Sequence, residues 1–313
     1  MESLLQSGRR RDDGEALPTV FKSLADKGVH FYRGSVHVTA AAPGVGKSIF
    51  ALRHALGMPS VPTLYICMDT PRHITVVRAA QMLTTSYKAV VEAQLEEAES
   101  EIWDELATAN HIGAFYRSGV TAEEITLMIG AFAEIKGEFP HYVIIDNLVN
   151  IAYEGDSEVQ AQRTIMSELD TIAKEANICV HILTHVSGNY KGGTTPIPQD
   201  GVMNKISEYQ HTTITLTRSL TENQLLWACV KNRTGPSDPS GMNRTPLKAN
   251  FDVMQIEDSI RAEIEYVDSV PNQFPAKYEG RCSSDDCDFF ENAISIDDPI
   301  VLYEGRPYHV ECA

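Results

Sequence analysis

The sequence predicts an α/β fold in which helices cover both faces of a mostly parallel sheet that ends in an antiparallel hairpin. Short, continuous apolar runs rich in Ile, Val and Tyr occupy residues 61–68, 142–146 and 178–184, and such runs are typical of buried parallel strands. Helical patterns separate them, as a layered sheet requires. After residue 210 the pattern changes, because residues 212–218 and 225–231 alternate around a polar turn. That alternation predicts the hairpin.

The first predicted strand, residues 35–41, leads directly into a phosphate-binding loop. Residues 41–48 read Ala-Ala-Pro-Gly-Val-Gly-Lys-Ser, which matches G-x-x-x-x-G-K-[ST] except that Ala41 replaces the first glycine. A helical pattern over residues 48–56 follows, and Gly57 closes it. This context suits the motif, since inward-turned backbone N–H groups and the helix N-terminus together attract a phosphate.

The loop predicts a site for ATP and Mg²⁺. Lys47 is expected to reach the β- and γ-phosphates, and the Ser48 hydroxyl is expected to ligate Mg²⁺. The competing interpretation is a Gly-rich turn without a ligand. The residues predicted to hold the nucleotide are Pro43, Gly44, Val45, Gly46, Lys47, Ser48 and Ile49.

Three further helices are expected between the strands. The first spans residues 88–110, with a Glu-rich outer face and apolar residues at spacings of three and four. A helix over residues 123–136 follows Thr121 as a candidate N-cap, and another over residues 158–176 follows Ser157. The apolar residues of the first helix are Val91, Leu95, Ala98, Ile102 and Leu106.

Polar residues follow three of the strands where phosphate chemistry needs them. Asp146 ends an apolar strand in the manner of a Walker B segment and is expected to orient Mg²⁺, unless it simply starts a turn. Asp69 follows the earlier strand, where a carboxylate would polarise the attacking water or cap a helix. His185 closes the next strand and would contact the γ-phosphate, the alternative being a solvent-facing histidine.

The predicted hairpin delivers two cations at its far end. Lys231 and Arg233 stand two residues apart, so on a strand their side chains point the same way. That arrangement suits insertion into the phosphate site of a neighbouring subunit, as arginine fingers do. A solvated charged turn is the alternative.

Composition limits the class of protein. The chain has 313 residues, of which 43% are hydrophobic and 22% charged, ordinary values for a globular protein. No apolar run approaches the roughly 20 residues that span a bilayer, and no secretory signal is recognisable, so a cytoplasmic protein without membrane contact is expected. The formal net charge of −17 argues against a protein that coats nucleic acid with its outer surface. Cys67, Cys179 and Cys229 lie in apolar runs and are expected to be buried thiols.

The order and spacing of these motifs resemble the RecA-type ATPase core of ring-shaped replicative helicases of the DnaB type, from about residue 17 to residue 253. The resemblance implies a RecA-like fold and a homo-oligomer, a hexameric ring with ATP sites between subunits. It gives Asp69 the place of the family's catalytic glutamate, here a shorter carboxylate, and Asp146 that of the Walker B aspartate. His185 takes the place of a strand-end glutamine. The family's K-x-R-x-G-P signature, which reaches the adjacent subunit's nucleotide, corresponds to Lys231, Arg233, Gly235 and Pro236.

The resemblance also implies DNA-binding loops that line the channel of the ring. The candidate is residues 187–205, where Lys191 would meet a phosphate while Gly192 and Gly193 let the backbone approach closely. Lys205 is expected to assist. A flexible lid unrelated to DNA is the alternative.

The C-terminal residues predict a separate zinc module. Cys282 and Cys287, then His309 and Cys312, form two pairs 21 residues apart, and tetrahedral Zn²⁺ takes four such ligands. The intervening sequence resembles the hairpin of LIM-like or treble-clef modules, although the first knuckle is longer than C-x2-C. Free thiols are the alternative, since a disulfide suits a cytosolic chain poorly.

These observations divide the chain into an N-terminal arm or linker (residues 1–30), a RecA-like ATPase domain (31–256), a linker (257–275) and a zinc module (276–313). The predicted function is an ATP-hydrolysing ring motor on single-stranded DNA, either a helicase or a related DNA-processing ATPase in replication. Replication or recombination proteins are candidate partners. The alternatives are a RecA-like recombinase or loader that assembles a filament, and a nucleotide-switched scaffold.

Overall fold

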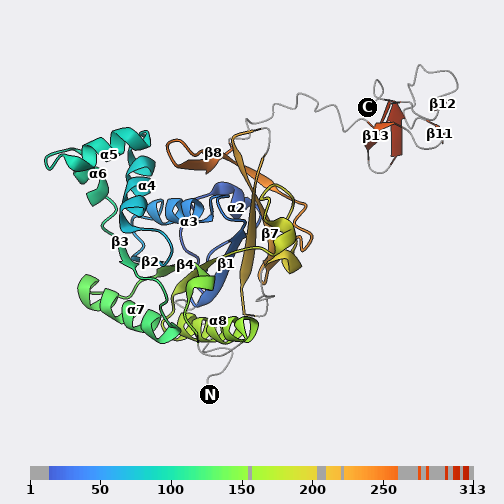
Figure 1. Ribbon diagram of the computed structural model, residues 1–313. Coiled ribbons are helices and arrows are strands. Elements are labelled where there is room, and N and C mark those ends of the chain that lie inside the picture. Colours follow the sequence, from blue (N-terminus) through green and yellow to red (C-terminus); the bar gives the residue numbers. More distant parts are fainter. Residues whose placement is uncertain are drawn as a thin grey trace. The chain divides into compact units, whose positions relative to one another are not determined.

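The structure, a computed structural model, describes residues 14–153, 157–202, 209–219 and 222–259, together with the backbone of short strands between residues 274 and 309. The chain divides into two compact units, Met1–Ser259 and Ile260–Ala313. The larger unit holds every element of the predicted ATPase domain (Figure 1).

A sheet of nine strands forms the centre of the larger unit, in the order β3-β2-β4-β5-β1-β6-β7-β8-β9. Neighbours from β3 to β6 pair in parallel, and β7, β8 and β9 continue the sheet antiparallel. The predicted mixed sheet with its hairpin is therefore confirmed. The strands are β1 (Ser35–Ala41), β2 (Thr63–Cys67), β3 (Ile112–Tyr116), β4 (Tyr142–Asp146), β5 (Cys179–Thr184), β6 (Thr212–Arg218), β7 (Gln224–Asn232), β8 (Thr245–Asn250) and β9 (Gln255–Asp258).

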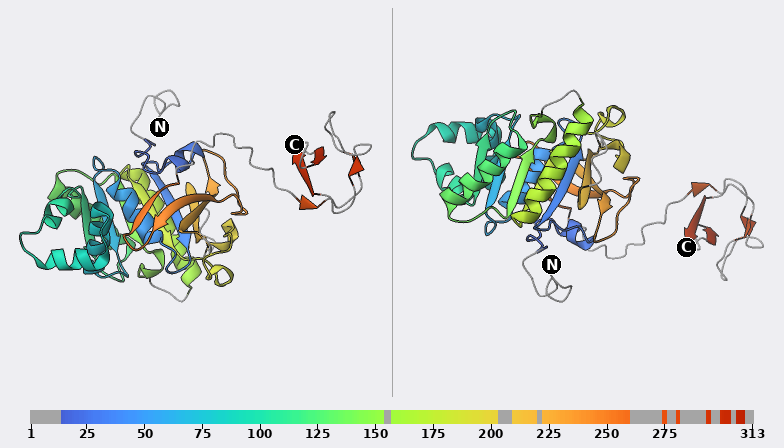
Figure 2. Two further views of the ribbon diagram at one scale, coloured as in Figure 1. Left: turned by 90° about the horizontal axis from the view of Figure 1, so that it is seen from above. Right: turned by 90° about the horizontal axis from the view of Figure 1, so that it is seen from below.

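Helices cover both faces of this sheet. In Figures 1 and 2, α7 and α8 lie on one face, while α3 and α4 lie on the other with α5 and α6 outside them. The helices are α2 (Lys22–Asp26), α3 (Lys47–Leu56), α4 (Arg72–Thr84), α5 (Lys88–Glu96), α6 (Ile102–Ala107), α7 (Ala122–Lys136) and α8 (Glu158–Glu175), with 3₁₀ turns η1 (Leu148–Asn150), η2 (Gly188–Tyr190) and η3 (Gln199–Gly201). Among the described residues, no helix combines the length and apolar character needed to cross a membrane.

Two predicted helix starts are confirmed with their caps. The Thr121 hydroxyl accepts a hydrogen bond from the Glu124 backbone N–H, and the Glu124 carboxylate accepts one from the Thr121 N–H, which forms a capping box at α7. The Ser157 hydroxyl accepts from the Gln160 N–H at 3.4 Å at the start of α8. Local side-chain chemistry therefore sets both boundaries.

The single helix predicted over residues 88–110 is wrong, because the segment forms two helices. Glu97 has extended backbone angles (φ −92°, ψ 118°), and its carbonyl accepts a hydrogen bond from the Trp103 indole at 2.9 Å. The bend lets Val91 of α5 and Ile102 of α6 pack into one small core with Val77 of α4 and its neighbour Ala80. Packing of both helices around α4 thus prevails over the continuous helical pattern.

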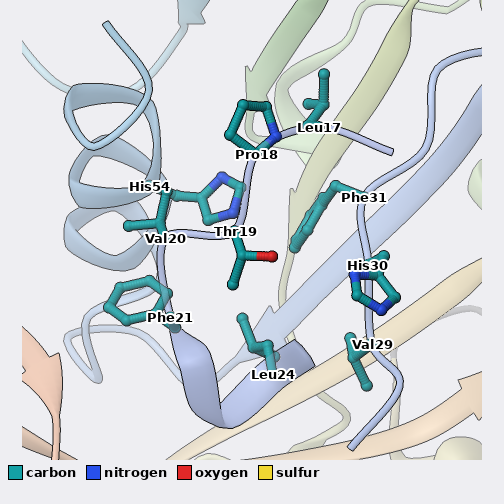
Figure 3. Close-up of a pocket in the computed structure, with 10 residues that line it drawn as sticks. All are labelled: Leu17, Pro18, Thr19, Val20, Phe21, Leu24, Val29, His30, Phe31 and His54. Atoms are coloured by element: carbon teal, nitrogen blue, oxygen red, sulfur yellow. The ribbon is translucent and has the colours of Figure 1, made fainter. Parts of the chain in front are cut away.

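The N-terminal segment was expected to be an arm or linker up to residue 30, but its described part belongs to the core. Leu17, Phe21 and Leu24 are buried, and with other residues of the segment and His54 of α3 they surround a cavity of about 10 Å³ (Figure 3). The Asp258 carboxylate of β9 accepts hydrogen bonds from the backbone N–H groups of Lys22 and Ser23, at 2.5 and 3.0 Å. The compact unit therefore extends past both predicted boundaries, residues 31 and 256.

Three histidines lie in the core beneath the sheet. His181 contacts the Tyr142 hydroxyl through Nδ1 at 2.5 Å and the Thr39 hydroxyl through Nε2 at 2.7 Å. Burial lowers the pKa of His37 and of His54 to about 3 in each case, so both are neutral at physiological pH. The predicted burial of the thiols of Cys67, Cys179 and Cys229 is confirmed.

The smaller unit contains short antiparallel pairs. β13 (Pro299–Tyr303) and β14 (Arg306–His309) form a hairpin, with β10 (Phe274–Pro275) beside β13, and β11 (Gly280–Arg281) pairs with β12 (Ala293–Ile294). Cys282, Cys287 and Cys312 lie outside the described residues, and only the backbone is described at His309. The zinc site thus remains a prediction.

Candidate nucleotide-binding site

The predicted phosphate-binding loop joins β1, at the centre of the sheet, to α3 (Figure 1). Gly44 and Gly46 have positive φ angles of 75° and 123°, which favour glycine. A Cβ atom at Gly46 would lie 3.2 Å from the Phe251 ring. The second glycine of the motif is therefore required by both backbone conformation and packing, and Lys47, 7% exposed, starts the helix behind it.

Residues far along the chain hold this loop in place. The Arg218 guanidinium donates from Nε to the Val45 carbonyl at 3.0 Å and lies 3.8 Å from the centroid of the Phe251 ring. Arg218 ends β6, and Phe251 lies in the turn between β8 and β9. Sequence reasoning missed both residues, since neither belongs to a motif.

Asp146 lies at the carboxyl end of β4 with its side chain fully buried. Its Oδ2 accepts a hydrogen bond from the Tyr65 hydroxyl at 2.8 Å, whereas Oδ1 has no partner of normal geometry among the described residues. Burial raises the pKa of Asp146, while Ser48, Tyr65 and the Lys47 charge oppose that shift. An orphaned buried carboxylate oxygen beside a serine hydroxyl fits an oxygen-ligated Mg²⁺.

Asp69 is brought to the same place from the neighbouring strand end. Ligand atoms of Cys67, Asp69 and Asp146 all lie within 4.8 Å of one another. The exposed Asp69 carboxylate accepts hydrogen bonds from the Asn147 amide at 3.0 Å and the Thr70 hydroxyl at 3.1 Å. The carboxylate therefore has a defined position at the site and remains open to solvent.

His185 follows β5, half-buried, on the other side of Asp146. Burial, and then the nearby Lys47 charge, lower its pKa, and the Asp69 charge and a hydrogen bond with the Ala41 backbone oppose this. The imidazole is therefore neutral at physiological pH. The structure thus gathers Lys47, Ser48, Asp69, Asp146 and His185 at the carboxyl edge of the sheet.

Lys231 and Arg233 lie elsewhere, at the amino edge of the sheet. His37 of β1 aligns with Thr212 of β6, which in turn aligns with Asn232 of β7. Arg233 follows Asn232 and donates its backbone N–H to the His211 carbonyl at 3.0 Å. The level of His37 is four residues, or about 13 Å of strand, from Ala41 and the loop. These two cations therefore do not join the phosphate-binding loop of their own chain.

The predicted DNA-binding segment divides into exposed and buried parts. Lys191 and Gly192 are exposed, but Gly193 is buried with a φ angle of 73°. A Cβ atom at Gly193 would lie 2.7 Å from Val45, and its carbonyl accepts the Arg218 backbone N–H at 2.8 Å. Gly193 thus packs against the phosphate-binding loop, while Lys205 lies outside the described residues.

Comparison with known proteins gives two similar sequences. The Gene 65 protein of Mycobacterium phage L5 is 32% identical over 260 residues, covering 80% of this chain and 95% of that protein. The Gene 65 protein of Mycobacterium phage D29 is 32% identical over 232 residues, covering 71% and 98% respectively. No protein-family model matches the chain.

Two solved structures share the fold. One is an isolated ATPase domain, which superposes with a TM-score of 0.64 at 18% identity, covering 81% of this chain and 95% of that one. The other is a DnaB-like replicative helicase, solved in a study of its interactions with primase, which gives a TM-score of 0.66 at 19% identity, covering 79% of this chain and 62% of that one. The predicted DnaB-type ATPase core is therefore confirmed as a fold.

Proposed function

We propose that this chain, which belongs to the family of the Gene 65 proteins of Mycobacterium phages L5 and D29, is an ATP-hydrolysing, ring-forming motor that acts on single-stranded DNA. One observation carries the proposal: the phosphate-side residues gather at one edge of the sheet, whereas the candidate arginine finger lies at the opposite edge. A complete site then needs two subunits.

Hydrolysis uses the residues at the carboxyl edge. Lys47 holds the β- and γ-phosphates, and Ser48 and Asp146 would hold Mg²⁺, which when bound neutralises phosphate charge. Asp69 accepts the proton of the attacking water, because its carboxylate is exposed and fixed by Asn147. His185, held neutral beside Lys47, hydrogen-bonds the γ-phosphate.

The amino edge completes the site of the next subunit. Arg233 is exposed, and with Lys231 it would neutralise transition-state charge on the neighbour's phosphates. A head-to-tail contact of this kind closes into a ring when its rotation permits, and the family resemblance favours a hexamer.

Single-stranded DNA would meet the segment that contains Lys191 and Gly192, with help from Lys205. These residues supply backbone-phosphate contacts without base recognition. The formal net charge of −17 is compatible with this, because only a channel inside the ring needs positive charge.

A filament-forming recombinase or loader is the second candidate, since a head-to-tail contact that does not close gives an open helix. A nucleotide-switched scaffold is distinguished by slow turnover. Electron microscopy with ATP and single-stranded DNA separates rings from filaments.

The C-terminal unit is proposed to bind structural Zn²⁺ through Cys282, Cys287, His309 and Cys312, as their spacing suggests. Elemental analysis of the purified full-length chain tests this, with one Zn²⁺ per chain expected and none contradicting it.

The ATPase rate with and without single-stranded DNA tests the main proposal. We expect DNA to stimulate the wild-type rate and Lys47→Ala to abolish hydrolysis. DNA-stimulated hydrolysis that persists in Lys47→Ala would show that the loop is misinterpreted.

A further inference from the structure

A thiol stands beside the two carboxylates of the proposed catalytic centre. Cys67 ends β2 and aligns in register with Asp146, which ends the neighbouring strand β4. Asp69 follows two residues after Cys67, and ligand atoms of all three residues lie within 4.8 Å of one another. The register of two parallel strands, and not a flexible loop, therefore brings the sulfur to the carboxylate of Asp146.

The ligand atoms are available for a metal ion. Asp146 Oδ1 is fully buried and has no hydrogen-bond partner of normal geometry among the described residues. The Cys67 thiol makes one weak hydrogen bond, to the Thr70 carbonyl at 3.3 Å, and lies 3.9 Å from the Thr75 hydroxyl. Asp69 is exposed, so an ion can enter from solvent. A buried carboxylate oxygen without a partner is unfavourable, which points to a cation at this position.

The presence of sulfur decides which cations this group of ligands favours. Mg²⁺ takes oxygen ligands, whereas Zn²⁺ and Cd²⁺ bind thiolate strongly. One sulfur and two carboxylates would supply three protein ligands to a four-coordinate ion and leave a fourth position open for water or a phosphate oxygen. The three residues thus match a soft divalent ion better than they match Mg²⁺.

We propose that Cys67, Asp69 and Asp146 form a binding site for a thiophilic divalent ion, Zn²⁺ or Cd²⁺, and that this ion competes with Mg²⁺-dependent hydrolysis. On binding, the Cys67 sulfur exchanges its proton for the metal, the proton passes to solvent, and the hydrogen bond to Thr70 is lost. Because Asp146 serves both ions, they exclude each other. The inhibition rests on the proposed ATPase function, but binding of the ion does not.

Binding is measured with Cd²⁺ through the thiolate-to-cadmium charge-transfer absorption. The full-length chain is used with Cys282, Cys287 and Cys312 changed to serine, so that the remaining thiols are Cys67, Cys179 and Cys229. We expect one Cd²⁺ per chain. Cys67→Ala should weaken Cd²⁺ affinity by about 100-fold or more, since a lost ligand costs at least as much as a lost outer-shell partner.

Cys229→Ala is the matched control, because it removes another buried thiol on β7 and should keep the absorption. Cys67→Ser, closer in size to cysteine, replaces Cys67→Ala if the latter does not fold. An absorption that is absent from the starting protein, or unchanged in the folded Cys67 variant, would overturn the proposal.

Inhibition is read as the ratio of ATPase rates with and without Zn²⁺ at constant Mg²⁺. This ratio should be low with Cys67 present and near one in its Ser or Ala variant. Equal ratios would overturn the competition even if Cd²⁺ binds. Cd²⁺ binding in a chain that hydrolyses no ATP would instead support the metal site and reject the proposed function.

Discussion

The two edges of the central sheet differ in what they carry. The carboxyl edge of the parallel strands holds a glycine-rich loop, a buried lysine and two carboxylates, whereas the amino edge carries Lys231 and Arg233 at the end of a hairpin. Phosphate transfer needs both groups at one phosphate. About 13 Å of strand separates the two levels, so the comparison indicates that each edge contributes to a different site.

The largest effect is expected at the amino edge. Arg233→Ala should bind nucleotide almost normally, because the phosphate-binding loop of its own chain is intact, yet lose hydrolysis by about a thousandfold or more, as removal of an arginine finger does. Nucleotide affinity and ATPase rate are measured on the same protein. Lys248→Ala, an exposed cation on β8, is the control and should keep its rate. A full rate in a monomeric Arg233→Ala protein would remove the main support for shared sites.

At the carboxyl edge, Asp69→Asn sharpens the comparison by separating binding from chemistry. The amide retains an oxygen for Asn147 but loses the base, so hydrolysis should fall by about 100-fold or more while nucleotide affinity holds. Single-turnover hydrolysis measures the chemical step. A wild-type rate would leave Asp69 as a helix cap and require another base.

Acid should act on the core beneath the amino edge. Burial lowers the pKa of His37 and of His54 from 6.5 to about 3, so the unfolded chain binds more protons as the pH falls below about 6.5. The free energy of unfolding therefore declines from there towards about pH 3, by about 2 kcal/mol for each histidine at about pH 5. Urea unfolding across this range measures it. His54→Phe, which cannot bind a proton, should reduce the slope, and an unchanged slope would contradict the assignment.

The smallest effect is expected at the contact between the DNA-binding segment and the phosphate-binding loop. Gly193→Ala places a Cβ atom 2.7 Å from Val45 at a positive φ angle, a strain of about 1–3 kcal/mol, and should weaken nucleotide binding several-fold. Gly192→Ala, with open space at its Cβ position, should keep the affinity measured without DNA. Equal affinities for the two variants would show that the contact does not matter.

Elements with strong local signals could be predicted from the sequence. The strand that ends at Asp146 is a continuous apolar run, and Thr121 and Ser157 cap their helices through residues three positions away. β3 was missed because it is an edge strand with Gly113 and Ala114 at its centre and no fully buried residue. Its pattern is therefore neither apolar nor alternating.

The supports of the site depend on contacts between residues far apart in the sequence. Tyr65 and Asp146 meet across 81 positions because β2 and β4 pair in register. Arg218 reaches Val45 across 173 positions. Motif spacing predicts which residues touch phosphate, but only the sheet order shows which side chains hold them.

Mixing Lys47→Ala with Arg233→Ala subunits tests most directly whether the two edges serve different chains. Each variant alone should be inactive, and after subunit exchange some interfaces would pair an intact phosphate-binding loop with an intact Arg233. Exchange is followed by native mass spectrometry, and ATPase activity is measured on the same sample. The shared-site account predicts that partial activity reappears in the mixture. Mixed assemblies that remain inactive, with exchange demonstrated, would contradict simple complementation between the two edges.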